Sequence, residues 1–253
     1  MTNSLDGTVA LVTGASSGIG EATAHLLAQH GAAVALVARR VDRLEELAAK
    51  LTASGASVLS IQADVTNRDE AFGAVERVVT ELGRLDTVIN NAGVMLLGPI
   101  EHAPVEEWER MVQVNLLGLL YSAKAALPHL LKAAEGEPRG ADLVNISSVA
   151  GRVARLGSGV YNATKHAVGA FSESLRQEVT GRHVRVSLVE PGAVATELAS
   201  HNRPEIREQI SQRFASTQRM EAADIADVIG YIVSRPRHVA INEVLVRPTE
   251  QQQ

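Results

Sequence analysis

Short apolar runs alternate with longer stretches of helical periodicity along almost the whole chain. Such runs are typical of parallel strands that are buried on both faces. Strands are predicted near residues 8–13, 33–38, 57–63, 86–90, 141–147, 183–190 and 243–246. Helices are predicted near residues 18–30, 41–54, 68–82, 105–134, 158–180 and 221–234. The alternation predicts one α/β domain over residues 1–253, with a doubly wound, seven-stranded parallel sheet and helices on both faces.

Four segments stand apart from this pattern. Pro128 lies inside the fourth predicted helix and is expected to kink it without splitting it. Residues 136–140, with Pro138, are predicted to form a loop. Residues 192–220 form the longest stretch without a clear pattern, and loops of this length in compact domains are usually functional, here as a substrate loop. The glutamine-rich residues 250–253 are expected to be disordered.

Composition narrows the class of protein. The chain has no cysteine, which excludes disulfides and thiolate metal sites and fits a reducing, cytoplasmic location. Its eight histidines show no metal-binding spacing, so no metal is expected. No run approaches the ~20 apolar residues of a membrane span, and the net charge of −5 gives no footprint for nucleic acid. A small molecule is the expected partner.

A glycine-rich turn follows the first predicted strand. The segment Thr13-Gly14-Ala15-Ser16-Ser17-Gly18-Ile19-Gly20 ends an apolar run and begins a helical pattern. Glycines allow a tight turn and close backbone approach, and a helix N-terminus offers free N–H groups to a pyrophosphate. The glycine spacing is three residues and then one, unlike the usual dinucleotide fingerprint. The expected contacts come from Gly14, Ser16, Ser17, Gly18, Ile19 and Gly20.

A serine, a tyrosine and a lysine stand at fixed distances further along the chain: Ser148, Tyr161 and Lys165. Residues four apart share a helix face, so Tyr161 and Lys165 can act together. The ammonium is expected to lower the pKa of the phenol from its usual value of about 10. Ser148 follows an apolar run, so its hydroxyl is expected at the carboxyl end of a strand, where open α/β sheets bind ligands. The three side chains predict a proton donor and a hydrogen-bond donor aimed at one oxygen.

With both motifs present, the chain resembles the short-chain dehydrogenase/reductase family over nearly its whole length, which implies a Rossmann domain. The resemblance implies hydride transfer between a nicotinamide and a carbonyl or alcohol carbon. Tyr161 would act as general acid in reduction and as base in oxidation, while Ser148 polarises the same oxygen. Lys165 would also hold the nicotinamide ribose. Asn115 matches the family asparagine of a water relay to the lysine, the alternative being a packing role.

The resemblance extends to further cofactor contacts. Asp64 and Val65 match the adenine site, although Asp64 also reads as a turn or cap residue. The Asn-Asn-Ala-Gly motif matches the segment beside the ribose, with Asn90 as the foremost contact. The full set expected from these motifs is Asp64, Val65, Asn90, Asn91, Ala92, Gly93, Tyr161, Lys165, Pro191, Gly192, Val194 and Thr196.

The end of the second predicted strand indicates which cofactor is used. An NAD enzyme places an acidic residue there for the ribose 2′-hydroxyl, whereas this chain has Ala38 followed by Arg39 and Arg40. A guanidinium can bind a 2′-phosphate through paired, charge-assisted hydrogen bonds. The sequence therefore predicts NADP(H), with Arg39 as the stronger of the two candidates. The alternative is that both arginines merely begin a helix in solvent.

The substrate is less defined. Met95, Ser148, Arg152 and Arg155 are the candidate contacts, because both ends of the segment from Ser148 to Tyr161 must border the pocket. Either arginine could bind a substrate carboxylate, or both could be solvated loop residues. The segment Ala-Arg-Arg, Glu190 before Pro-Gly, and the ending at residues 241–249 resemble an NADP-dependent subgroup that includes clavulanate and hydroxy-acid dehydrogenases. An aldehyde or ketone substrate is expected.

The same residues bear on alternative functions and on the assembly. A nucleotide-binding sensor without turnover usually loses the tyrosine or the lysine, and both are present here. Epimerases and dehydratases on this scaffold mostly need a longer C-terminal domain. Apolar residues of two predicted helices exceed what one sheet face can cover, so a homotetramer is expected, with a dimer as the alternative. These residues are Leu116, Leu117, Leu119, Leu120, Leu127, Leu130, Val168 and Phe171.

Overall fold

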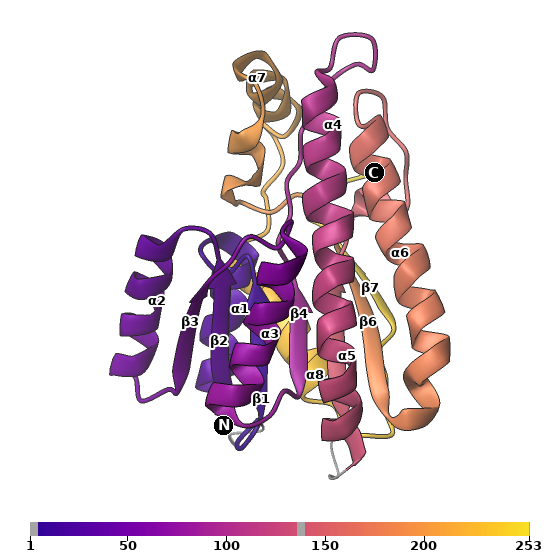
Figure 1. Cartoon of the computed structure of the whole chain (residues 1–253). Coiled ribbons are helices and arrows are strands. Elements are labelled where there is room, and N and C mark those ends of the chain that lie inside the picture. Colours follow the sequence, from indigo (N-terminus) through magenta and orange to yellow (C-terminus); the bar gives the residue numbers. More distant parts are fainter. Residues whose placement is uncertain (1–4, 136–139, 253) are drawn as a thin grey trace.

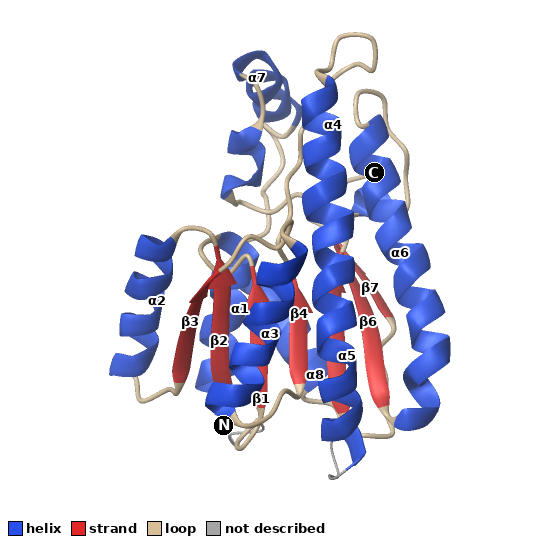
Figure 2. Ribbon diagram, viewed as in Figure 1, coloured by secondary structure: helices blue, strands red, loops and turns tan. Residues whose placement is uncertain are grey.

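Seven parallel strands form one sheet in the computed structural model, which describes residues 5–135 and 140–252 (Figures 1 and 2). The strands are β1 (Val9–Thr13), β2 (Ala33–Ala38), β3 (Val58–Gln62), β4 (Thr87–Asn90), β5 (Ala141–Ile146), β6 (Val184–Pro191) and β7 (Glu243–Val246). Their order in the sheet is β3-β2-β1-β4-β5-β6-β7. Each predicted strand is confirmed to within a residue or two, and so is the doubly wound α/β fold.

The helices fill the connections between the strands. They are α1 (Gly18–Gln29), α2 (Val41–Ala53), α3 (Arg68–Leu82), α4 (Val105–Val112), α5 (Leu119–Glu135), α6 (Gly159–Val179), α7 (Pro204–Arg213) and α8 (Ala222–Val233). Short 3₁₀ turns span Val149–Gly151, Thr180–Arg182 and Glu197–His201. None of the helices in the described residues is long and apolar enough to span a membrane.

The sheet is covered on both faces. Alternate residues of β1 point to opposite sides, so Val9 and Leu11 pack in one apolar cluster and Ala10 and Val12 in the other. The first cluster contains residues of α3, α5 and α6, and the second contains residues of α1, α2 and α8. Figure 2 shows α3 and α5 in front of the sheet and α1 and α8 behind it. Burial on both faces explains why the strands are apolar throughout.

The long helix predicted near residues 105–134 contains an irregularity. A π-helical turn at Gln113–Gly118 separates α4 from α5, and Asn115 lies within it. The 3.6-residue periodicity of the sequence gives no signal for this extra residue per turn. Pro128 lies inside α5, which continues without a break to Glu135 as predicted.

The two segments predicted to be irregular contain more structure than expected. Residues 192–220, the cavity loop, hold the 3₁₀ turn Glu197–His201 and the helix α7. The tail is also placed, because Gln251 Oε1 accepts a hydrogen bond from Ala193 N at 2.8 Å and Glu250 Oε2 accepts one from Gln218 N at 3.2 Å. Residues 250 and 251, for which disorder was expected, thus contact the cavity loop in the structure. Residues 136–139 of the predicted loop, and residue 253, lie outside the described residues.

Candidate active site

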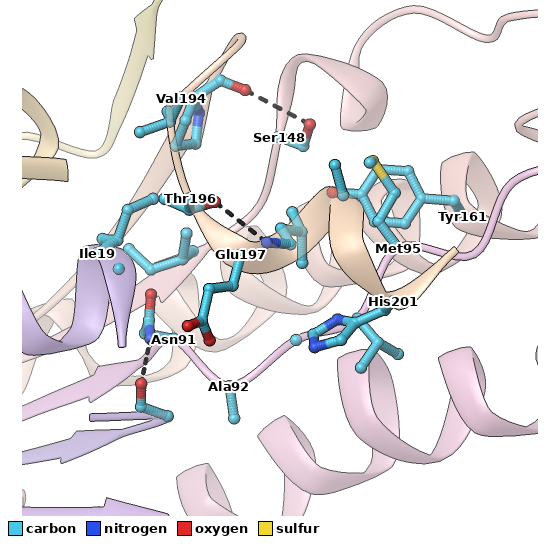
Figure 3. Close-up of a pocket in the computed structure, with 18 of the residues that line it drawn as sticks. Ile19, Asn91, Ala92, Met95, Ser148, Tyr161, Val194, Thr196, Glu197 and His201 are labelled. Carbon is cyan, nitrogen blue, oxygen red and sulfur yellow. Dashed lines mark hydrogen bonds between the residues drawn. The ribbon is translucent and has the colours of Figure 1, made fainter. Parts of the chain in front are cut away.

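A cavity of about 400 Å³ opens at the carboxyl ends of the strands. It lies where the strand order reverses between β1 and β4, which is the usual ligand site of doubly wound sheets. Figure 3 shows Ile19 and Asn91 on one side of it and Tyr161 and Met95 on another, with the cavity loop running between them. Residues far apart in the sequence therefore meet around one space.

The glycine-rich turn connects β1 to α1 as predicted. Gly14 and Gly18 have φ values of +66° and +58°, which side-chain-bearing residues rarely adopt. A Cβ on Gly20 would lie 2.4 Å from the carbonyl oxygen of Gly14. Only glycine at this position therefore lets α1 begin directly against the turn, with its free N–H groups facing the cavity.

Two neighbouring asparagines have different roles. Asn91 lines the cavity, and its Nδ2 donates to Thr13 O at 3.1 Å and to Gly14 O at 3.3 Å, which ties the end of β4 to the glycine-rich turn. Asn90 is buried and does not line the cavity, because its Nδ2 donates to Asn145 Oδ1 at 2.9 Å. The sequence favoured Asn90 as the foremost contact, whereas the structure places Asn91 in the cavity wall and Asn90 in a hydrogen bond between two strands.

Ser148 and Tyr161 meet in the cavity wall. Ser148 follows β5 and caps the 3₁₀ turn behind it, since its Oγ accepts from Ala150 N at 3.1 Å. The Ser148 hydroxyl donates to Pro191 O over a long distance of 3.4 Å, so this weak contact can give way to a ligand oxygen. Tyr161 is 6% exposed near the start of α6, and its phenol hydrogen-bonds to Ser148. The predicted pair of hydroxyl groups is therefore assembled.

Lys165 lies one turn beyond Tyr161 on α6, on the same buried face. Its Nζ donates to Ile146 O at 2.8 Å and lies 6.0 Å from the centre of the Tyr161 ring. Burial lowers the pKa of Lys165 to about 8. Burial also raises the pKa of Tyr161 to about 12, although the hydrogen bond from Ser148 acts in the opposite direction. The predicted lowering of the tyrosine pKa is therefore wrong for the ligand-free chain, because desolvation of the phenol outweighs the distant ammonium.

The comparisons with known proteins agree with this geometry. A family model described as short chain dehydrogenase matches residues 8–207. The chain belongs to the short-chain dehydrogenase/reductase family. It is 38% identical over 252 residues to an uncharacterized oxidoreductase of Staphylococcus saprophyticus, and the match covers 98% of this chain and 99% of that one. The protein is therefore an oxidoreductase of this family.

Solved structures of the family superpose on nearly the whole chain. A closed form of serine dehydrogenase complexed with NADP+ matches with a TM-score of 0.89 at 32% identity, covering 97% of both chains. A 3-ketoacyl-(acyl-carrier-protein) reductase from Brucella melitensis complexed with NADH matches with a TM-score of 0.84 at 28% identity, covering 96% of this chain and 98% of that one. Both phosphorylated and unphosphorylated dinucleotides thus occur among the similar folds.

Asn115 uses its amide within the protein. Its Oδ1 accepts from Val94 N at 2.8 Å, and its Nδ2 donates to Val94 O at 2.8 Å and to Thr164 Oγ1 at 3.2 Å. All these contacts are buried. Through them the Asn115 side chain joins the π-helical turn to the segment after β4 and to α6. It therefore holds the elements that carry Met95 and Lys165, and it does not line the cavity.

The two arginines after β2 both line the cavity but differ in their partners. Arg40 donates to Ser16 Oγ at 2.9 Å and Ser17 Oγ at 2.7 Å, and its Nη1 pairs with Glu197 at 2.9 Å. Arg39 is 58% exposed and lies 3.7 Å from Asp64. Arg40 is therefore the better ordered of the two, whereas the sequence favoured Arg39.

Asp64 and its neighbours complete this end of the cavity. Asp64 and Val65 line it, and Asp64 Oδ1 also accepts from Thr66 N at 2.9 Å. Burial opposes ionisation of Asp64, but the Thr66 hydrogen bonds and Arg39 outweigh it and lower its pKa. Asn67 caps α3 by accepting from Asp69 N and Glu70 N. Asp64 thus combines a turn role with a place in the cavity wall.

Arg152 does not reach the cavity. Its Nε pairs with Glu190 at 2.7 Å, and its Nη2 pairs with Glu243. Glu190 is 1% exposed, so an arginine partner at this position is needed to compensate its buried charge. Arg152 is therefore a structural counter-ion and not a substrate contact, which also explains why an acidic residue stands at Glu190.

The cavity loop is fixed over the opening at three places. Thr196 packs on the glycine-rich turn, where a Cβ on Gly18 would lie 3.1 Å from its side chain. Val194 and Met220 form a parallel bridge that joins the two ends of the loop. Buried Asn202 accepts from Leu97 N at 2.7 Å and donates to Met95 O at 2.8 Å. The loop is thus anchored beside the site, and Asn202 positions the Met95 segment.

The residues around the cavity fit a dinucleotide. The glycine-rich turn presents backbone without side-chain obstruction, and cations lie at the end of β2 with no acidic residue there. All the expected cofactor contacts line the cavity except Gly20 and Asn90. The sequence did not identify Glu197, His201, Arg213 or Arg219, which also line it. These residues lie on the cavity loop, where no motif marks them.

Proposed function

We propose that this oxidoreductase reduces an aldehyde or ketone to an alcohol with NADPH, and catalyses the reverse reaction with NADP+. The observation that carries the proposal is the meeting of Ser148 and Tyr161 in one cavity with the glycine-rich turn and Arg40. The bound nicotinamide would supply the hydride. We also propose that the chain belongs to the NADP-dependent subgroup that it resembles in sequence, which includes clavulanate and hydroxy-acid dehydrogenases.

The protein's own groups handle the proton. With a pKa of about 12, Tyr161 keeps its phenolic proton at neutral pH and is ready to donate it to the carbonyl oxygen as a general acid. The Ser148 hydroxyl donates a hydrogen bond to that same oxygen and stabilises its developing charge. Protonated Lys165 stabilises the phenolate that remains, and the cavity loop excludes water.

Screening carbonyl compounds for oxidation of NADPH, followed by absorbance, tests this proposal. Reduction of at least one aldehyde or ketone is expected. A nucleotide-binding sensor without turnover is the alternative, and it would bind NADPH while leaving every carbonyl unreduced. The retained Tyr161 and Lys165 favour the enzyme.

The pH profile of carbonyl reduction should show the loss of the proton from the Lys165 ammonium. Because the pKa of Lys165 is about 8, its ammonium is present below pH 8 and is lost above it. The phenolate then lacks its cation, so kcat/KM should fall above pH 8 although Tyr161 still carries its proton. Initial rates between pH 6 and pH 10 at saturating NADPH measure this limb.

Lys165→Arg is the control for that assignment. A guanidinium keeps its proton through this range, so the variant should be slower but show no limb near pH 8. An unchanged limb in the variant would assign the titration to another group.

Assembly as a homotetramer, with a dimer as the alternative, remains a proposal. Most of the apolar residues behind it pack within one chain: Leu119, Leu130 and Val168 are buried, and Leu120, Leu127 and Phe171 lie against the core. Val105 and Val112 are exposed on α4 and seven positions apart, so they share one helix face that a second chain can cover.

Light scattering should find four chains for the wild type and a lower mass for Val112→Glu, which places a charge in that face. The matched control is Val41→Glu, at an exposed valine on α2, which should leave the mass unchanged. A wild-type monomer at micromolar concentration would contradict the proposal.

A further inference from the structure

The guanidinium of Arg155 forms part of the cavity wall and has no ion-pair partner among the described residues. Arg155 lies between Ser148 and Tyr161 in the sequence and lines the cavity. Its Nε and Nη2 are buried and have no hydrogen-bond partner in the part of the chain that the structure describes. Leaving charged donors unpaired and out of water is unfavourable. The arrangement is therefore incomplete without a ligand that supplies acceptor atoms.

The position of Arg155 relative to Tyr161 is fixed by Asn162. Asn162 Oδ1 accepts from Arg155 N at 3.3 Å, and its Nδ2 donates to Ala150 O at 2.7 Å and Val153 O at 2.8 Å. Asn162 is buried and follows Tyr161 directly on α6. A ligand held by Arg155 is thus held at a defined place with respect to the phenol, which is the condition for orienting a reacting carbon.

Two arginines of the cavity loop, Arg213 and Arg219, also line the cavity. Arg213 ends α7 and Arg219 follows it, and each guanidinium lies 5.8 Å from the centre of the Phe214 ring. Among residues 5–135 and 140–252, neither forms an ion pair with a carboxylate. Burial lowers the pKa of Arg155, and the charges of Arg213 and Arg247 add to this effect. Arg213 and Arg247 therefore repel the Arg155 charge in the ligand-free chain.

The arginines at the other end of the cavity are different. Arg39 lies beside Asp64, and Arg40 pairs with Glu197. Positive charge without an ion-pair partner among the described residues is thus contributed to the cavity wall by Arg155, Arg213 and Arg219. An anion is the ligand class that such a cluster of guanidinium groups binds.

We propose that the substrate is a carbonyl compound that carries an anionic oxyacid group, in its simplest form a carboxylate, and that Arg155 binds this group together with Arg213 and Arg219. This inference rests on the proposed function. The substrate is held at two points, its acid group at the arginines and its carbonyl oxygen at Ser148 and Tyr161. Charge-assisted bonds from the guanidinium fork would select acids over their neutral analogues.

A panel of matched substrates tests the proposal. The acids are pyruvate, acetoacetate and succinic semialdehyde, the neutral analogues are their methyl esters, and glycolaldehyde phosphate represents phosphate. Wild-type protein should prefer at least one acid over its ester by about tenfold or more in kcat/KM. Preference for the phosphate alone would keep the anion site and replace the carboxylate.

Charge-removing variants locate the site. Arg155→Gln and Arg213→Gln should each lower kcat/KM for the preferred acid by about tenfold to a hundredfold, since each removes a charge-assisted hydrogen bond. The rate with the ester should change by less than about threefold. The control is Arg207→Gln, an exposed arginine on α7 that does not line the cavity, and it should leave both rates unchanged.

Three outcomes would overturn the inference: no preference for any anionic substrate, carboxylate or phosphate; equal losses for acid and ester; or a matching loss of NADPH affinity that reassigns Arg155 to the cofactor. Reduction of the esters without acid preference would leave the proposed function standing. If no compound oxidises NADPH, the proposed function fails instead. Calorimetric titration of lactate into the protein saturated with NADP+ then tests the anion site alone, and equal affinity in wild type and Arg155→Gln would refute it.

Discussion

Tyr161→Phe should lower carbonyl reduction by about a hundredfold to ten-thousandfold, the contribution usual for a positioned general acid. The phenyl ring fills the same buried space beside Ser148, so the fold and the cavity should persist. Affinity for NADPH, measured by the change in its fluorescence on binding, should stay near that of the wild type. The expected loss is therefore in the chemical step and not in cofactor binding.

Tyr231→Phe is the matched control for this change. Tyr231 is exposed on α8, its ring lies 4.0 Å from the Arg235 guanidinium, and it does not line the cavity. Its loss of a hydroxyl should not alter turnover. A Tyr161→Phe protein with activity within about tenfold of the wild type would remove Tyr161 from the role of proton donor.

Cofactor preference should shift toward NADH when the end of β2 is changed. In Ala38→Asp/Arg39→Leu, the new carboxylate repels a 2′-phosphate and can accept a hydrogen bond from a ribose hydroxyl instead. Removing a charge-assisted phosphate contact costs about 1.5 to 3 kcal/mol, and repulsion adds to it. The ratio of kcat/KM for NADPH to that for NADH should therefore fall by about a hundredfold or more.

Arg40→Leu distinguishes between the two guanidinium groups. Because Arg40 is the one held against Ser16 and Ser17, this single change should reproduce a large part of the loss for NADPH with little effect on NADH. The control is Arg43→Leu, since Arg43 pairs with the same Glu197 but does not line the cavity. An unchanged NADPH preference in both cavity-facing variants would mean that another residue binds the phosphate.

The features that the sequence predicted well depend on local patterns. The positions of strands and helices follow from runs of apolar residues and from the period with which apolar residues recur. Both patterns lie within the element itself. The glycine-rich turn could be predicted because Gly14, Gly18 and Gly20 meet steric demands that other residues cannot. Tyr161 and Lys165 were placed together because helical geometry brings residues four apart onto one face.

The features that the sequence missed depend on partners far along the chain. Arg152 and Arg155 look alike in sequence, but Glu190 and Glu243 pair with the first and leave the second in the cavity wall. Likewise, the pKa of Tyr161 depends on how completely the fold buries it. Such outcomes come from tertiary packing, and spacing alone carries no information on them.

The ion pairs of Glu197 would make the rate of cofactor release depend on which cofactor is bound. Glu197 links the cavity loop to Arg40 at 2.9 Å and to Arg43 at 2.7 Å, and these partners lower its pKa to about 2, so it stays ionised. A phosphate that binds Arg40 competes with this carboxylate for one guanidinium. If the 2′-phosphate binds Arg40 as proposed, loading with NADPH would leave Glu197 with Arg43 as its partner and loosen the loop, whereas NADH would leave both ion pairs intact. Discrimination between the two cofactors would therefore appear in the rate of product release as well as in affinity.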